Sequence, residues 1–204
     1  MSTYYNFYTE ANVGGTWYCI DPRVLQLEHG DRPMSYVINN TYWNGSRSYF
    51  SEAYDKLEEI ASRIKLEDTS AEFRMHKILN WKGDDSKIAP YYDQILYAIP
   101  YRRLCELYER SKRPEYCGLY KKSDIALYED GTLEDLYDRE IDPEKYSALV
   151  DEARRIYQYY EWNDPMSWRS QIPILYKLVE ARIREFEDVN FLECDDVRIL
   201  MYAD

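Results

Sequence analysis

Histidine and cysteine, which supply most protein metal sites and many catalytic bases and nucleophiles, are scarce in this 204-residue chain. The two histidines, His29 and His76, lie at no ligand spacing from a cysteine. The four cysteines are far apart and form no CxxC pair; they are Cys19, Cys105, Cys117 and Cys194. We therefore expect no zinc site and four free thiols, and no local motif supports a cysteine–histidine nucleophile.

The chain also lacks the motifs of the common enzyme classes. It contains no GxSxG, GxxxxGK[ST] or GxGxxG pattern, which disfavours acyl transfer, nucleotide hydrolysis and dinucleotide redox chemistry. One catalytic alternative stays open, because Asp84, Asp85 and Asp93 could hold magnesium for a hydrolysis reaction. Since Gly83-Asp84-Asp85-Ser86 is more typical of a solvated turn, we expect a protein that is not an enzyme and uses no cofactor.

Long apolar runs are missing as well. No stretch approaches the roughly 18 residues that are needed to cross a membrane. The first ten residues have no basic segment followed by an apolar one, so they do not resemble a secretory signal. We expect a cytoplasmic protein without membrane contact. The length fits one domain, residues 1–204, with a core large enough to fold without disulfides or metal.

Two-residue alternation of side chains over residues 4–11 predicts the first strand. Residues 3–21 predict a hairpin that turns near Gly14-Gly15. A second hairpin is predicted from residues 116–121 and 124–129. Further strands are predicted at residues 34–38 and, near the end of the chain, at 197–202.

Apolar residues at helical spacing predict four to five amphipathic helices. The predicted segments are 50–64, 69–79, 100–112, 142–160 and 164–186. Thr69 and Glu72 form a capping-box pattern, Pro100 fits a first helical turn, and Asp142-Pro143 is a strong helix start. Two hairpins, these helices and a C-terminal strand predict an α+β fold rather than a regular βαβ alternation.

Charge is distributed unevenly along a chain whose net charge is −12. Between residues 129 and 144 there are eight carboxylates and one base, Arg139. A second acidic stretch covers residues 185–196, and seven Lys or Arg residues gather between residues 102 and 122. A chain this acidic is a poor candidate for general nucleic-acid binding, but it could bind a protein that is itself basic.

The first acidic stretch has two interpretations. Its carboxylates could solubilise loops and cap helices, or they could form a face that stands in for a phosphate backbone and meets a basic groove. Tyrosine, with 23 residues against five phenylalanines, adds rigid side chains that suit an interface. The candidate partner-binding residues are Glu129, Asp130, Glu134, Asp135, Asp138 and Glu140.

Three segments carry a family resemblance. They are Tyr4–Ala11, Trp17–Asp21 and Gly45–Phe50, all within the first 60 residues. They resemble small accessory proteins of phages and prophages of Gram-positive bacteria, some of which are anti-CRISPR inhibitors of Cas9-type nucleases. The resemblance implies a binding protein that acts in a bacterial host cell without a cofactor and whose partner is a large basic nuclease. It assigns no functional residue.

These observations favour a non-enzymatic inhibitory protein that docks an acidic, tyrosine-bearing surface on a basic nucleic-acid-handling enzyme such as a CRISPR nuclease. Two alternatives stay open. One is a carboxylate–metal hydrolase centred on Asp84, Asp85 and Asp93. The other is a structural or regulatory phage protein whose interface joins copies of itself.

Overall fold

The computed structural model describes residues 5–21, 51–79, 95–190 and 193–203. The predicted strand at 34–38 lies outside these residues. So do Asp84, Asp85 and Asp93, the candidate magnesium ligands.

A five-stranded antiparallel sheet forms the body of the protein, with the strand order β2-β1-β7-β4-β3. The predicted hairpin at 3–21 is confirmed as β1 (Tyr5–Val13) and β2 (Thr16–Cys19). Gly14 and Gly15 form its turn with φ angles of 61° and 85°, which residues that carry a side chain rarely adopt. The predicted terminal strand is β7 (Val197–Ala203), and it lies at the centre of the sheet.

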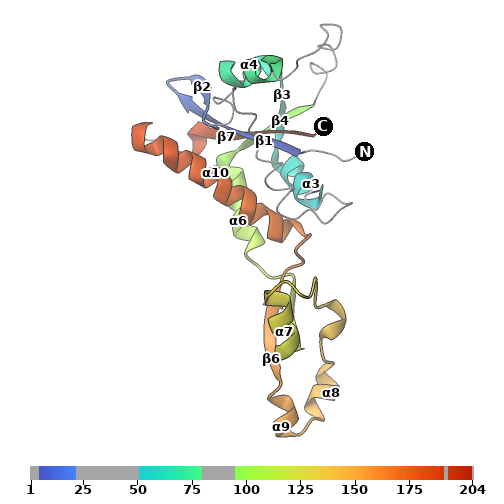
Figure 1. Cartoon of the computed structure of the whole chain (residues 1–204). Coiled ribbons are helices and arrows are strands. Elements are labelled where there is room, and N and C mark those ends of the chain that lie inside the picture. The colour runs from blue at the N-terminus through green and yellow to red at the C-terminus, as the bar shows by residue number, and fades with distance from the viewer. Residues whose placement is uncertain (1–4, 22–50, 80–94, 191–192, 204) are drawn as a thin grey trace.

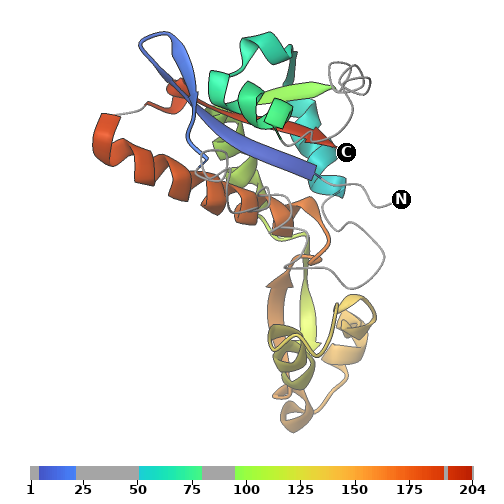
Figure 2. The same ribbon diagram turned by 45° about the horizontal axis from the view of Figure 1, so that its top comes forward.

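Helices cover both faces of this sheet (Figures 1 and 2). One face packs on α3 (Ser51–Ile60), α6 (Tyr101–Ser111) and α10 (Trp168–Asn190), through a core that includes Phe7, Leu57, Leu104, Ile172 and Ile199. The other face packs on α4 (Ala71–Leu79), around Tyr8, Phe73 and Leu200. Because β1 is buried on both faces, its successive side chains enter two different apolar layers in turn.

Residues 115–163, which we call the arm, leave the body between α6 and α10 and project away from the sheet (Figure 1). A two-stranded antiparallel ladder of β5 (Tyr116–Lys121) and β6 (Tyr157–Trp162) forms its axis. Between them lie α7 (Lys122–Glu129), a 3-10 turn (Tyr137–Arg139), α8 (Pro143–Ser147) and α9 (Asp151–Arg154). The arm has its own apolar cluster of Tyr120, Ile125, Leu136 and Trp162.

The α+β prediction is confirmed, but the second predicted hairpin is wrong. Residues 124–129 belong to helix α7, where Ile125 and Tyr128 turn to the same side at helical spacing. The partner of β5 is β6, within the segment for which a helix was predicted. The helix start at Asp142 is confirmed, because its carboxylate accepts the N–H groups of Glu144 and Lys145, yet the helical part ends by Arg154.

The structure also corrects three helix boundaries. Helix α3 ends at Ile60, and Ser62–Ile64 is the edge strand β3. Ser70, rather than Thr69, caps α4 by accepting the N–H of Phe73 at 3.2 Å. Pro100 is the last residue of β4 (Leu96–Pro100), a strand that the sequence analysis missed, and α6 follows directly.

A buried ion pair ties the two central strands to the layer above them. The carboxylate of Glu10 on β1 is fully buried and accepts a hydrogen bond from Nε of Arg198 on β7 at 2.8 Å, while Nη2 of Arg198 lies 2.7 Å from the same oxygen. The same carboxylate accepts the N–H of Ser70 at 2.7 Å, just before α4. Arg198 also donates to the carbonyl of Asp68, and its guanidinium lies 3.8 Å from the ring centroid of Trp17.

Replacing Glu10 by glutamine is expected to lower the free energy of unfolding by about 3–5 kcal/mol, because it leaves Arg198 largely buried without its counter-charge. Urea unfolding followed by tryptophan fluorescence measures the change. The control is Glu67→Gln, which alters an exposed carboxylate and should stay within about 0.5 kcal/mol. Equal stability of the two variants would contradict the role given to Glu10.

Candidate partner-binding surface

Hydrogen bonds and ion pairs at its root join the arm to the body. Arg169, in the first turn of α10, donates to the carbonyls of Arg110 and Arg113 at 2.8 and 2.9 Å, at the end of α6. Its Nε lies 3.5 Å from the carboxylate of Glu115, where the arm begins. The N–H of Glu115 in turn donates to the side chain of Asn163 at 2.8 Å, where the arm ends. The two strands of the arm therefore leave the body as a closed pair.

Aromatic rings hold the arm together around Trp162. The rings of Tyr116, Tyr128 and Tyr137 lie 4.7 to 5.5 Å from it, and its indole N–H donates to the hydroxyl of Tyr120 at 3.0 Å. These rings account for a share of the high tyrosine content.

Tyr137 links this cluster to the root of the arm, since its hydroxyl lies 2.6 Å from a carboxylate oxygen of Asp164. Burial, and next the bond to Asp164, raise the pKa of Tyr137 above its ordinary value. The hydroxyl therefore stays protonated and donates to that carboxylate.

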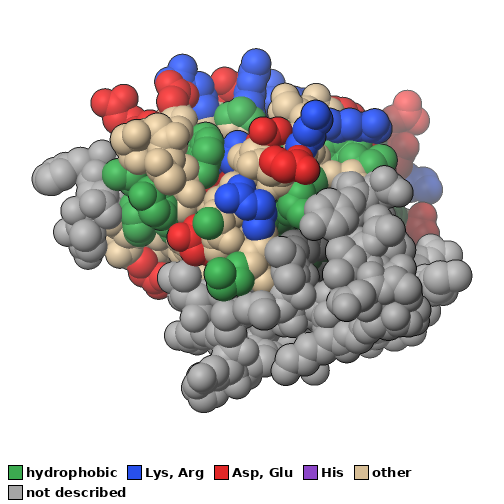
Figure 3. Space-filling model, turned by 90° about the horizontal axis from the view of Figure 1, so that it is seen from above, with side chains coloured by type: hydrophobic (Ala, Val, Ile, Leu, Met, Phe, Trp, Pro, Cys, Tyr) green, Lys and Arg blue, Asp and Glu red, His purple; other side chains and the backbone are tan. Residues whose placement is uncertain are grey.

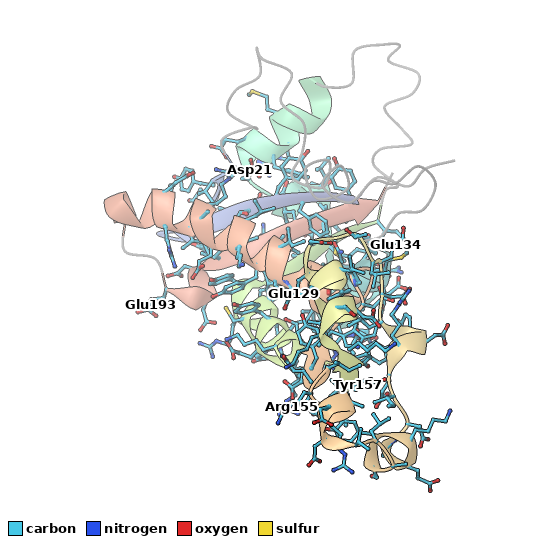
Figure 4. The ribbon with its side chains drawn as sticks, turned by 60° about the horizontal axis from the view of Figure 1, so that its bottom comes forward. Asp21, Glu129, Glu134, Arg155, Tyr157 and Glu193 are labelled. Carbon is cyan, nitrogen blue, oxygen red and sulfur yellow. The ribbon has the colours of Figure 1, made fainter. Side chains whose placement is uncertain are left out.

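The six predicted carboxylates share one continuous segment of the arm, and all six are exposed. The segment begins at the end of α7, crosses the root side of the arm and then follows the outer edge of β5, where the N–H of Ile141 donates to the carbonyl of Leu119 at 2.9 Å. Figure 4 shows Glu129 and Glu134 at the end of the arm nearer the body, and Arg155 and Tyr157 farther out.

Four of the six carboxylates have a local structural role. Asp130 accepts the N–H of Thr132 at 2.8 Å, and Asp135 accepts that of Tyr137 at 3.2 Å. Glu129 accepts the hydroxyl of Tyr160 at 3.2 Å. Glu140 lies directly over Gly118, where a Cβ would come within 2.4 Å of its carboxylate oxygen. These four carboxylates therefore contribute to local structure, and the expected helix cap in this stretch is Asp142.

The other two, Glu134 and Asp138, make no hydrogen bond or ion pair within the described part of the chain. More generally, none of the eight carboxylates between residues 129 and 144 lies within 4.0 Å of a described Lys or Arg nitrogen. Arg139, the one base of the stretch, pairs instead with Asp124 on α7, at 3.7 Å. The segment thus presents uncompensated negative charge.

The body handles its charges differently. In the second acidic stretch, Asp195 pairs with Arg102 at 2.6 Å and Glu185 pairs with Arg182 at 3.0 Å. Two further bases, Arg103 of α6 and Lys112 directly after it, pair with glutamates of that helix. Acidic and basic side chains are also interspersed on the described part of the face shown in Figure 3. Local pairing therefore separates the body from the acidic segment of the arm.

The sequence analysis missed one exposed feature of the arm, the free face of the β5–β6 ladder. Tyr159 is 57 % exposed on this face, near Cys117. The hydrogen bond with the Cys117 thiol is the main cause that raises the pKa of Tyr159 to about 12. The two-residue spacing of Tyr157 and Tyr159 is the signal that could have revealed this strand.

Other properties of the chain concern thiols, metals and membranes. Cys19, Cys105 and Cys117 are free thiols. Within the described ranges, no three His, Cys, Asp or Glu side chains come close enough together to hold a metal ion. No helix in those ranges is long and apolar enough to span a bilayer.

Comparison of the chain with protein-family models, with curated proteins and with solved structures gives no match.

The turn that carries Asp130 should be visible in an acid titration. The hydroxyl of Thr132, and next its N–H, lower the pKa of Asp130 below the ordinary aspartate value. The bonds to the charged carboxylate stabilise this turn above the unfolded pKa, and the stabilisation is lost as the pH falls through the folded pKa. Carboxyl-carbon NMR should record the low value, and Thr132→Val should raise it. An unchanged Asp130 titration in that variant would contradict the assignment.

Proposed function

We propose that this protein is a non-enzymatic binding protein that inserts its arm into a basic groove of a nucleic-acid-handling enzyme and so competes with nucleic acid. The observation that carries the proposal is the combination of projection and unpaired charge. Residues 115–163 hold 13 carboxylates and six Lys or Arg, which gives −7 of the total net charge of −12. All of that excess comes from residues 129–144, where the carboxylates have no described cationic partner.

The physical argument is one of preorganisation. Free acidic side chains on a flexible loop lose conformational entropy when they bind, whereas those of Asp130, Asp135 and Glu129 are already held by hydrogen bonds. Each still has carboxylate oxygen available at an exposed site. A duplex carries one negative charge per roughly 1.7 Å of its axis, and closely spaced carboxylates suit a groove that evolved to bind such a charge array. Association with that groove would be fast and sensitive to salt.

Exposed aromatic side chains supply the apolar part of such an interface. Tyr116, Tyr137 and Tyr159 are between 37 and 57 % exposed, and all three lie on the arm. Tyrosine gives a large rigid contact surface at low entropic cost. The arm therefore combines attraction at long range with contact area at short range.

The identity of the partner rests on the resemblance of the first 60 residues to phage and prophage accessory proteins. Together with the acidic arm, it supports a Cas9-type nuclease of the bacterial cytoplasm as the enzyme that is inhibited. Such nucleases hold their nucleic acids in positively charged channels, which suits a projection that carries an acidic segment.

The test reverses charge where no structural role is disturbed. Glu134→Lys with Asp138→Lys should weaken binding to a guide-loaded Cas9-type nuclease by about 100-fold at low salt, since interfacial charge pairs couple by about 1.5 kcal/mol or more. Competition against a fluorescent target duplex measures the affinity. Asp135 is left unchanged, because it holds the N–H of Tyr137.

The matched control is Asp55→Lys with Glu67→Lys, which makes the same charge change at two exposed carboxylates of the body. It should bind like the parent. Equal affinities of all three proteins across a salt series would refute the role of the acidic segment, and failure of the parent to displace the duplex would refute the proposed competition.

A further inference from the structure

The outer edge of β6 is the feature that the acidic segment leaves unexplained. In an antiparallel ladder, residues alternate between those that bond to the partner strand and those whose N–H and C=O point away from it. Lys122 donates to the carbonyl of Ile156 at 2.9 Å, which fixes this pair as a bonded one. Counting along the register, Tyr157, Tyr159 and Glu161 are therefore the residues that point away from β5.

The other side of the ladder confirms this phase. Leu119 lies opposite Tyr159, and its carbonyl points outward to accept the N–H of Ile141. The outer edge of β5 is thus covered by the chain itself. No such cover exists on β6 among the described residues, since none of them bonds to the N–H or C=O of Tyr157, Tyr159 or Glu161. In Figures 1 and 2, β6 forms the side of the arm that faces away from α8.

This edge also lacks the protection that natural sheets give to exposed strands. Edge strands are commonly blunted by lysine, proline or a bulge. The sequence of β6, Tyr-Gln-Tyr-Tyr-Glu-Trp, contains neither residue, and its register with β5 runs without interruption over six pairs. The side chains of Tyr159 and Glu161 are exposed on the free face of the ladder, whereas Tyr157 is half-buried and its ring centroid lies 6.0 Å from that of Tyr146 on α8. An added strand would find an aromatic contact at Tyr159 beside its backbone bonds.

Charge decides which occupant fits. A second copy of the chain would bring an identical edge, with its own Glu161 and Glu129, against this one. Glu161 lies on the edge itself, and Glu129 bonds to the neighbouring Tyr160, so the root end of the edge is acidic. A strand that places lysine or arginine beside the root end is attracted to this edge, and one that places a carboxylate there is repelled.

We propose that the outer edge of β6 takes up an extended basic segment of the partner enzyme as an added β-strand. The inference rests on the proposed function for the basic character of the partner, and it adds a second contact on the side of the arm opposite the acidic segment. Backbone hydrogen bonds of the added strand would supply affinity, and the tyrosines would select its side chains. A groove that bears such a segment could then contact the arm on both sides.

The probe is a nine-residue peptide of alternating threonine and valine with two lysines at each end, blocked at both termini. Its control is the same peptide with N-methylated backbone amides, which keeps side chains and charge but removes the donors. Isothermal calorimetry with the full chain should show binding of the first peptide, and binding of the control should be at least tenfold weaker. Tyr159→Pro removes an N–H that β5 does not use and should cause a similar loss. Tyr159→Thr keeps that N–H and should bind within about threefold of the parent.

The possible outcomes separate this inference from the proposed function. Equal binding of the two peptides, or binding of neither, overturns the β6 edge as a strand-addition site. A dimer of the chain in sedimentation that Tyr159→Pro dissociates would make a second copy the occupant, which also overturns the proposal. One result would separate the two hypotheses. If Glu134→Lys with Asp138→Lys leaves nuclease competition unchanged while the peptide still binds Tyr159→Thr better than Tyr159→Pro, the role of the acidic segment is refuted and strand addition at the β6 edge is supported.

Discussion

The buried carboxylate of Glu10 is the interaction on which the body depends. It joins strands that are 188 positions apart in the sequence and, through Ser70, fixes the entry to the helix on the upper face. A charge removed from water this completely is stable only where every oxygen has a donor. The pairing of β1 with β7 is therefore fixed in register as well as in order, and β4 joins the sheet through β7. Helices α6 and α10 pack on that sheet, and the arm is held between them.

The body and the arm follow different electrostatic rules. Several charged side chains of the described body are paired within a helix or across to a neighbouring element, as Arg182 is with Glu185 and Arg102 with Asp195. The arm leaves eight carboxylates of one segment without cationic partners, and its only base there turns to α7. Unpaired like charges destabilise a fold by repulsion, so their concentration on a narrow projection calls for an explanation other than solubility. Binding to a basic surface provides one, because it supplies the missing partners.

The sequence could predict those elements whose signal is local. The β1–β2 hairpin has its paired glycines, β7 its short apolar run, and α10 a long apolar stripe that tolerates Pro173. The β5–β6 pairing could not be found in the same way. Its strands are 35 residues apart, and the stripe through Tyr146 and Tyr157 continues at helical spacing across what is in fact a boundary between α9 and β6. Contact with β5 overrides local propensity there.

For the candidate site, too, the sequence revealed some features and not others. Composition alone located the acidic segment, and the structure places its six predicted residues on one projection. What the sequence could not show is which carboxylates are already engaged. Arg139 stands between Asp138 and Glu140 in the chain, yet its partner is Asp124. Engagement depends on the direction of each side chain in space, which a one-dimensional charge count does not contain.

The root of the arm has a consequence for how this protein can change over time. Glu115 and Asn163 are in direct contact, so the 47 residues between them begin and end at one point on the body. Lengthening, shortening or exchanging them leaves the separation between α6 and α10 unchanged, and a longer closed loop costs little additional entropy. The body can thus serve as an unchanged scaffold that accepts arms of different shape and charge. Partner recognition can then diverge while the sheet and its buried ion pair are conserved.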